Sequence, residues 1–139
     1  WNDMRLNAIS LLQEEAQLEE VVRLVGIDAL SDKDRLKLEV SKSIREDYLQ
    51  QNGFHEIDTF SSMEKQYKMI LLILKFKSES ERALESGVYL DKILKLDVRD
   101  KIARAKYVPE DELSKIDDIL KELENDMSKL IQEEGEVSD

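Results

Sequence analysis

The chain has 139 residues, of which 41% are hydrophobic and 38% are charged, and its formal net charge is -11. This acidic balance argues against nucleic-acid binding, which needs clustered Lys and Arg, and fits either a basic partner surface or simple solubility. The sequence has no cysteine, which excludes disulfides and thiol chemistry, and no run of about 20 apolar residues that could cross a membrane.

The fold class follows from the residues that the chain favours and avoids. Only 4 Gly and 1 Pro interrupt it, so its elements should be few and long. Glu, Lys, Leu and Ile dominate, and these residues favour helices or pack their inner faces. We predict an all-α, multi-helix bundle that forms a single domain over residues 1–139. The start, WNDMRLNAIS, has neither a secretory hydrophobic region nor an initiator Met, so we expect a piece of a longer chain.

The first predicted helix spans residues 2–25 and has one apolar stripe, with most of its glutamates outside that stripe. The stripe comprises Met4, Ala8, Leu11, Leu18, Val22 and Val25, and the glutamates are Glu14, Glu15, Glu19 and Glu20. Gly26 suits the left-handed backbone that commonly ends a helix. Ser31, with Asp34 three residues later, approaches a capping box and opens the second helix. That helix should stop at Asn52-Gly53, and its predicted inner face comprises Leu36, Val40, Ile44 and Tyr48.

An apolar loop, GFHEIDTFSS, separates the second helix from the third. Ser61 and Glu64 form another capping-box candidate at the start of the third helix, which should end at Gly87. The block Met69–Leu74 is apolar on every side and could be a buried strand in isolation, but the periodicity around it favours a core helix. Two short helices should follow, one over residues 90–96 and one opened by Asp97.

The last predicted helix has Pro109 in its first turn, followed by three acidic residues that suit the positive end of a helix dipole. Its inner seam repeats every three or four residues and comprises Leu113, Ile116, Leu120, Leu123, Met127 and Leu130. About three heptads are marginal for a free coiled coil but sufficient for docking on another helix. Residues 134–139 should form a frayed tail.

Few residues could carry chemistry. No glycine precedes Lys-Ser or Lys-Thr in a phosphate loop, and His55 is the only histidine, so two-His zinc ligation is excluded. The carboxylates lie on predicted helix faces, where the sequence does not distinguish a catalytic pair from carboxylates that are simply solvated. We expect no metal site and no catalysis by this chain alone. Composition and periodicity therefore indicate an acidic helical domain that binds a partner.

Residues 19–70 closely resemble the C-terminal domain of the A subunits, or alpha chains, of archaeal and vacuolar-type rotary ATPases. The segments RLVG, IREDYLQQNGFHEIDTFS and KQYKM carry the resemblance almost without gaps. It continues more loosely through Leu84–Gly87 and Ile102–Lys106, and the last helix matches only in character. The resemblance implies a C-terminal fragment of the catalytic, ATP-binding subunit, whose phosphate loop lies in an upstream domain.

What is known of this family sets the expectations for partners and cofactors. Three A subunits alternate with three B subunits around a central stalk, and ATP hydrolysis turns the stalk and drives protons or sodium ions across a membrane sector. The same assembly can run in reverse as a synthase. The resemblance thus implies the B subunits and the central-stalk subunits as partners, and ATP or ADP with Mg in the full-length subunit but none on this chain alone. It also implies a cytoplasmic position, peripheral to the membrane and without insertion.

The segment DALSDKD, Asp28–Asp34, looks like the acidic DELSEED loop that presses on the rotating stalk in related F-type enzymes. Ala29 and Lys33 replace two of its acids, and three aspartates with one lysine leave a charge of about -2, which favours a steric lever over an electrostatic one. The predicted stalk contact comprises Gly26, Ile27, Asp28, Ala29, Leu30, Ser31, Asp32, Lys33 and Asp34. The alternative is that Asp28 and Ser31 only shape a turn and cap a helix.

The resemblance also implies an adenine pocket in the apolar loop. Phe54 and Phe60 keep the F-x5-F spacing of two aromatic residues that pack against adenine in F-type β subunits. Ile57, Ser61 and His55 are further candidates for this pocket, since a flat base gains from stacking and from dry walls. Ordinary core packing of both rings is the alternative. Position 60 departs from the family of A subunits, where we expect Tyr.

A rival function, from a different class, is a free-standing acidic helical scaffold or interaction protein that binds a partner through its last helix. Such a protein would be a short gene product with no phosphate loop upstream.

Overall fold

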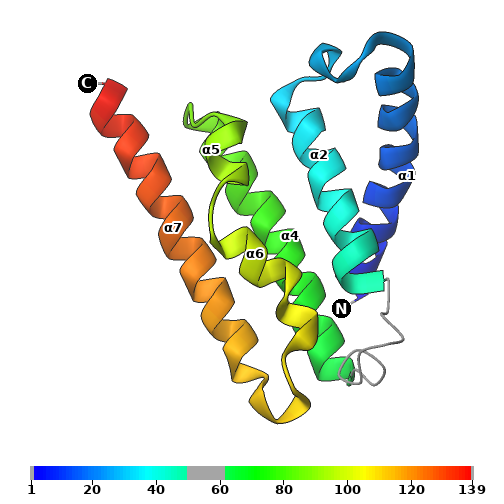
Figure 1. The fold of residues 1–139 in the computed structure, drawn as a ribbon, viewed down its shortest axis with the longest axis vertical. Coiled ribbons are helices and arrows are strands. Elements are labelled where there is room, and N and C mark those ends of the chain that lie inside the picture. Colours follow the sequence, from blue (N-terminus) through cyan, green and yellow to red (C-terminus); the bar gives the residue numbers. More distant parts are fainter. Residues whose placement is uncertain (1, 50–61, 139) are drawn as a thin grey trace.

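The computed structural model describes residues 2–49 and 62–138, and every regular element among them is helical (Figure 1). The prediction of an all-α bundle is therefore confirmed. The α-helices are α1 (Asn2–Val25), α2 (Asp32–Ser43), α4 (Met63–Glu85), α5 (Leu90–Leu94), α6 (Val98–Ala103) and α7 (Ser114–Ser138). The 3-10 turns are η1 (Ile27–Ala29), η3 (Ala105–Tyr107) and η4 (Glu110–Glu112), and a π-helical stretch, η2 (Ile44–Leu49), continues α2.

The long helices lie side by side in the order α1, α2, α4, α7, and each packs against the next (Figure 1). α1 and α2 form an antiparallel hairpin whose tip lies at the same end of the bundle as α5 and the C-terminus (Figure 1). α5 and α6 pack on α4, and α6 also reaches α7. The hairpin joins the rest of the bundle mainly through α2, and residues 24–29 at its tip are exposed.

Helix α4 is the centre of the core, and it confirms that the apolar block Met69–Leu74 is helical. Four of these six residues are buried and the other two are half-buried. Such a block needs apolar partners all round, and α4 packs against α1, α2, α5, α6 and α7. The predicted inner face of α2 is also confirmed, because Leu36, Val40 and Ile44 are fully buried and Tyr48 packs against the core.

Glycine ends two helices, as predicted, at Gly26 with φ 90° and at Gly87 with φ 94°. The end of α4 is a Schellman motif. The Val88 N–H donates to the Ala83 carbonyl at 3.0 Å, and the Gly87 N–H donates to the Leu84 carbonyl at 3.1 Å. This pair of hydrogen bonds fixes the direction in which the chain leaves α4 and enters α5.

The start of α4 differs from the prediction by one residue. The N-cap is Ser62, whose Oγ accepts a hydrogen bond from the Lys65 N–H at 3.0 Å. The Ser62 N–H in turn donates to the Glu110 carboxylate at 2.9 Å. The sequence has two adjacent serines, Ser61 and Ser62, either of which could supply a capping hydroxyl. The hydrogen bond between the Ser62 N–H and Glu110, 48 residues away, favours Ser62 as the cap. Ser61 lies outside the described residues, as does the predicted stop at Asn52-Gly53.

The last helix confirms its predicted seam but not its ends. Leu113, Ile116, Leu123 and Met127 are buried on the inner side of the chain that leads into and along α7. Pro109 precedes the η4 turn, and α7 begins only at Ser114. The helix continues to Ser138, where we predicted a frayed tail. Glu134 is half-buried, with its carboxylate 3.9 Å from the Lys92 ammonium, so a tertiary contact reaches the end of α7.

Two smaller predictions need correction. The stripe of α1 holds at its base, where Ala8 and Leu11 are buried, but Val25 near the tip is 65% exposed. Asp97 does occupy the N-cap position of α6, yet its side chain makes no capping hydrogen bond. The first difference arises because the end of α1 extends beyond the core, and the second because the Asp97 backbone is already helical, whereas a capping residue is typically extended.

Candidate functional site

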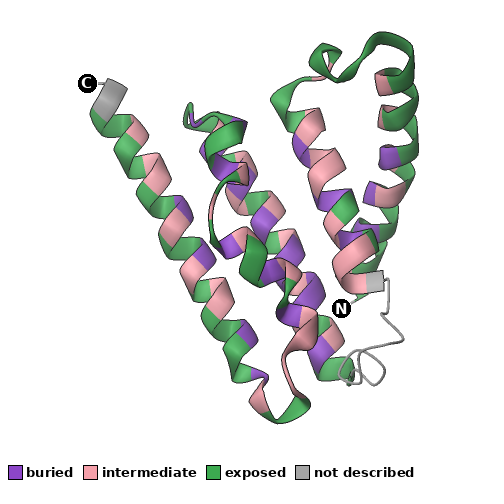
Figure 2. Ribbon diagram, viewed as in Figure 1, coloured by how far each residue is buried: buried purple, intermediate pink, exposed green. Residues whose placement is uncertain are grey.

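The candidate site is the tip of the α1–α2 hairpin, residues 26–34, which we call the knuckle. All nine residues predicted to contact a stalk lie in this segment, which runs from Gly26 through η1 into the first turn of α2. Every residue from 24 to 29 is exposed, as are residues 31–33, while Leu30 and Asp34 are half-buried (Figure 2). The knuckle is therefore an accessible surface at the end of a long two-helix arm.

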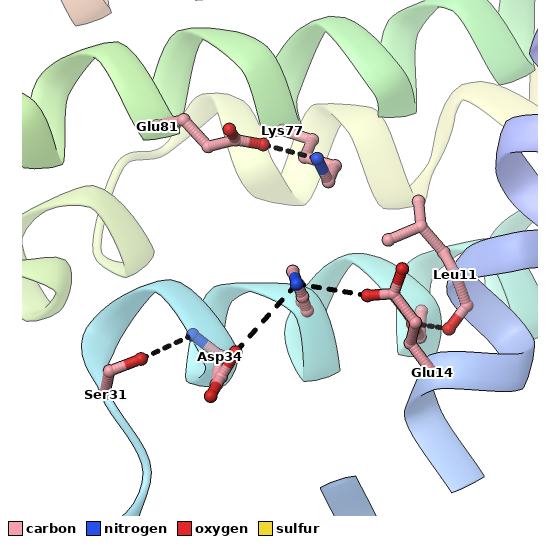
Figure 3. Close-up of polar contacts among 8 residues, drawn as sticks. Leu11, Glu14, Ser31, Asp34, Lys77 and Glu81 are labelled. Atoms are coloured by element: carbon pink, nitrogen blue, oxygen red, sulfur yellow. Dashed lines mark hydrogen bonds and ion pairs between the residues drawn. The ribbon is translucent and has the colours of Figure 1, made fainter. Parts of the chain in front are cut away.

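The backbone of the knuckle is well defined by short-range hydrogen bonds. The Gly26 N–H closes α1 on the Val22 carbonyl at 2.8 Å, and Gly26 then turns with φ 90° and ψ 160°. This region is essentially restricted to glycine. One 3-10 turn follows, and Ser31 caps α2 by accepting a hydrogen bond from the Asp34 N–H at 3.2 Å (Figure 3). The predicted capping role of Ser31 is thus confirmed, and it is compatible with a role in contact.

A lysine on α2 links the knuckle to α1. The Lys37 ammonium lies 3.1 Å from the Glu14 carboxylate and 3.9 Å from the Asp34 carboxylate, so it bridges the two helices (Figure 3). Asp32 lies 3.8 Å from Arg35, a long contact at an exposed position that contributes little. Asp28 is exposed to solvent at the turn. The knuckle therefore carries negative charge, part of which is compensated on its α2 side.

Two polar contacts, one buried and one partly buried, fasten the base of the hairpin. The Ser41 hydroxyl is fully buried and donates to the Leu11 carbonyl at 3.1 Å, which requires the two helices to approach closely (Figure 3). The Arg45 guanidinium donates to the Glu15 carboxylate at 2.8 Å, and this hydrogen bond, with the charge of Glu15, raises the pKa of Arg45 above its usual value. Glu15 was predicted to lie outside the apolar stripe, but only 8% of it is exposed.

The end of α1 and the start of the knuckle together carry an apolar patch that we did not predict. Leu24, Val25 and Ile27 are 73%, 65% and 49% exposed. Scattered apolar surface residues are normal, but three exposed apolar residues so close in sequence next to a turn make a candidate interaction surface. One signal in the sequence could have revealed it: three large apolar residues so close together around Gly26 cannot all face the same stripe.

A second polar region lies at the opposite end of α2, where η2 meets η3. Lys106 donates to the Glu46 carbonyl at 3.2 Å and lies 4.0 Å from Asp47. Burial raises the pKa of Asp47, and the Lys106 charge opposes that shift. Lys65 is fully buried and donates to the Lys106 carbonyl at 2.6 Å. These contacts join three elements, and they suit an anchor rather than a reaction centre because each cation has a partner.

The predicted adenine-pocket residues lie outside the described residues, so that hypothesis stays a prediction; they are Phe54, Phe60, Ile57, Ser61 and also His55. Over residues 2–49 and 62–138, no three His, Cys, Asp or Glu side chains gather as metal ligands. Within the same ranges, none of the helices combines the length and apolar character that a membrane span requires.

Comparison with known proteins gives a consistent result. The family model described as the C-terminal domain of V and A type ATP synthase matches residues 1–94. The chain is 69% identical, over 97% of its length, to a V-type ATP synthase alpha chain of Clostridium perfringens. It is 63% identical over 99% of its length to the corresponding protein of Clostridium novyi, and 64% identical over 97% to that of Clostridium botulinum. The chain spans 23–24% of the length of these relatives.

Proposed function

This chain belongs to the family of C-terminal domains of V and A type ATP synthases, and we propose that it is the lever by which the catalytic subunit of such an enzyme moves a rotating stalk. The observation that carries the proposal is the knuckle, an exposed tip at the end of a hairpin whose base is fastened by Ser41, Glu15 and Arg45. Force applied at one end of a stiff pair of helices reaches the other end without needing specific ion pairs at the tip.

The force on the knuckle would come from an upstream nucleotide-binding domain and pass through the helical bundle. Closure of an upstream nucleotide domain around ATP swings the whole bundle, because its apolar core resists internal deformation. Glu39 on α2 accepts a hydrogen bond from Arg99 on α6 at 3.0 Å, which links the hairpin to the body of the bundle beyond their apolar contact. The knuckle then bears on the stalk and turns it.

The remaining parts of the proposal concern the complete enzyme. The full-length subunit binds ATP or ADP with Mg in a domain upstream of this one, and alternates with B subunits in a ring around the central-stalk subunits. It couples hydrolysis or synthesis of ATP to ion transport across a membrane, and it lies on the cytoplasmic side, peripheral to that membrane. The relatives' name, V-type ATP synthase alpha chain, supports this role over that of a free-standing acidic scaffold, since they extend well beyond the present chain.

The test is single-molecule rotation of the assembled complex with the knuckle altered in two ways. Replacing residues 28–34 by a shorter glycine loop should lower the torque while leaving nucleotide binding intact, because the lever loses its reach. The matched variant Asp28→Asn/Asp32→Asn keeps the shape of the knuckle and removes two charges. It should retain most of the torque if the contact is steric. Full torque from the glycine-loop complex would refute the lever.

A further inference from the structure

A cleft of about 370 Å³ opens beside the knuckle, between the first turn of α2 and the turn that joins α4 to α5. Its wall on the α4 side is apolar and includes Leu84, Val88 and Tyr89. Its other wall includes Asp32 and Lys33, which are themselves knuckle residues. The cleft is therefore continuous with the surface to which we assign the stalk contact, although it lies on a different pair of elements.

Both walls are held in place before any partner arrives. The Schellman motif at Gly87 fixes the α4 side, and the Ser31 cap fixes the start of α2. Val88 is buried, so it anchors the turn, while Tyr89 immediately after it is 70% exposed. A tyrosine on a rigid turn loses little conformational entropy when it is covered, which is why such residues often dominate binding energy.

The charges around the cleft indicate what kind of partner it takes. Three carboxylates line it, from Asp32, Glu81 and Glu85, against the one ammonium of Lys33. Glu81 pairs with Lys77 along α4, while Glu85 is exposed and makes no ion pair within the described part of the chain. An apolar trough with an acidic border complements a helix that carries an apolar side chain flanked by Lys or Arg.

We propose that this cleft is a second contact for the stalk, in which Tyr89 packs against an apolar side chain of a basic stalk helix while the knuckle pushes beside it. The inference rests on the lever function proposed above. Two adjacent contacts, at the knuckle and at the cleft, also fix the orientation of the hairpin on the stalk better than one contact, because a single contact would let the hairpin move sideways on the stalk.

The experiment is site-specific photocrosslinking in the assembled complex, with a benzoylphenylalanine placed at one position of the full-length subunit. Position 89 probes the cleft, position 27 probes the knuckle, and position 67, another exposed tyrosine but near the start of α4, is the control. Peptide mapping should find stalk adducts from positions 89 and 27 and none from position 67. Adducts from position 27 alone would overturn the cleft contact and leave the lever standing. Stalk adducts from neither position 27 nor position 89 would overturn both.

A second measurement separates contact from mere proximity. Tyr89→Ala should weaken binding of the purified stalk to the ring about tenfold, whereas Tyr89→Phe, which keeps the ring, should restore it. Glu85→Gln should weaken binding less, and its effect should vanish at high salt because that contribution is electrostatic. Unchanged stalk affinity in Tyr89→Ala, in a complex that assembles normally, would overturn the proposal.

Discussion

Replacing Gly26 by alanine isolates the backbone conformation on which the knuckle depends. A Cβ built at Gly26 meets no atom within 4 Å, so the substitution creates no clash. The whole cost comes from holding an alanine at φ 90° and ψ 160°, a region in which side-chain-bearing residues lose about 1–3 kcal/mol. We therefore expect Gly26→Ala to destabilise the chain by that amount and to lower its Tm by roughly 3–10 °C.

The assay is urea and thermal unfolding of the 139-residue chain, followed by circular dichroism. Gly135→Ala is the matched control, because Gly135 is helical and its added Cβ also meets nothing within 4 Å. Alanine is preferred over glycine inside a helix by up to about 1 kcal/mol, so this control should be neutral or stabilising. The same added methyl group should therefore lower the stability at Gly26 and leave it unchanged or raise it at Gly135, although neither position has a steric clash. If Gly26→Ala unfolds at the wild-type urea concentration, the positive φ is not required and the knuckle is not the defined turn described above.

Three further predictions use the titrating groups and the apolar loop. Asp47→Asn should raise stability at neutral pH, because burial raises the pKa of Asp47 and its ionised form opposes folding; the gain should shrink as the pH falls through the folded-state pKa, and a constant gain would contradict this. Glu110→Gln should lower stability at neutral pH, because hydrogen bonds from Ser62 lower the pKa of Glu110. The deficit should disappear in acid, where the wild-type carboxyl is also protonated, and unfolding followed from pH 7 to pH 3 tests both variants. Phe54→Ala and Phe60→Ala should each weaken ATP binding by the full-length subunit by about 1–3 kcal/mol if the rings stack on adenine, whereas unchanged affinity with lost thermal stability would favour core packing.

The features that the sequence predicted correctly are those set by near neighbours along the chain. A helix stripe of period 3.6 identifies Leu36, Val40 and Ile44, because burial on one face needs no knowledge of the partner. Gly26 marks the start of the knuckle and Ser31 marks the start of α2 within it, because a positive φ and an N-cap are local requirements. The candidate knuckle could therefore be located to the residue before its three-dimensional arrangement was known.

The features that the sequence did not reveal depend on residues far apart in the chain. Glu15 is buried because Arg45, 30 residues away, reaches it, and no local pattern distinguishes it from the solvated glutamates beside it. Ser62 rather than the adjacent serine caps α4, with Glu110 bonding its N–H. The cleft at Tyr89 likewise requires α2 and the α4–α5 turn to be brought together. Periodicity could not have predicted these contacts, because it describes a helix face and not the groups that meet it.

The charged and apolar residues at and beside the knuckle would contribute differently to a force exerted on the stalk. An exposed ion pair is worth about 0–1 kcal/mol and is screened by salt, so a few aspartates hold a moving partner only weakly. Leu24, Val25 and Ile27 present apolar area that keeps its contact energy as the partner slides, because that energy does not depend on one fixed geometry. In the lever function that we propose, the acidic residues would select and orient a basic partner at a distance, while the apolar patch and the stiff hairpin would carry the force. Such a division of roles would let the proposed lever act without two of the acidic residues of the F-type loop, at Ala29 and Lys33.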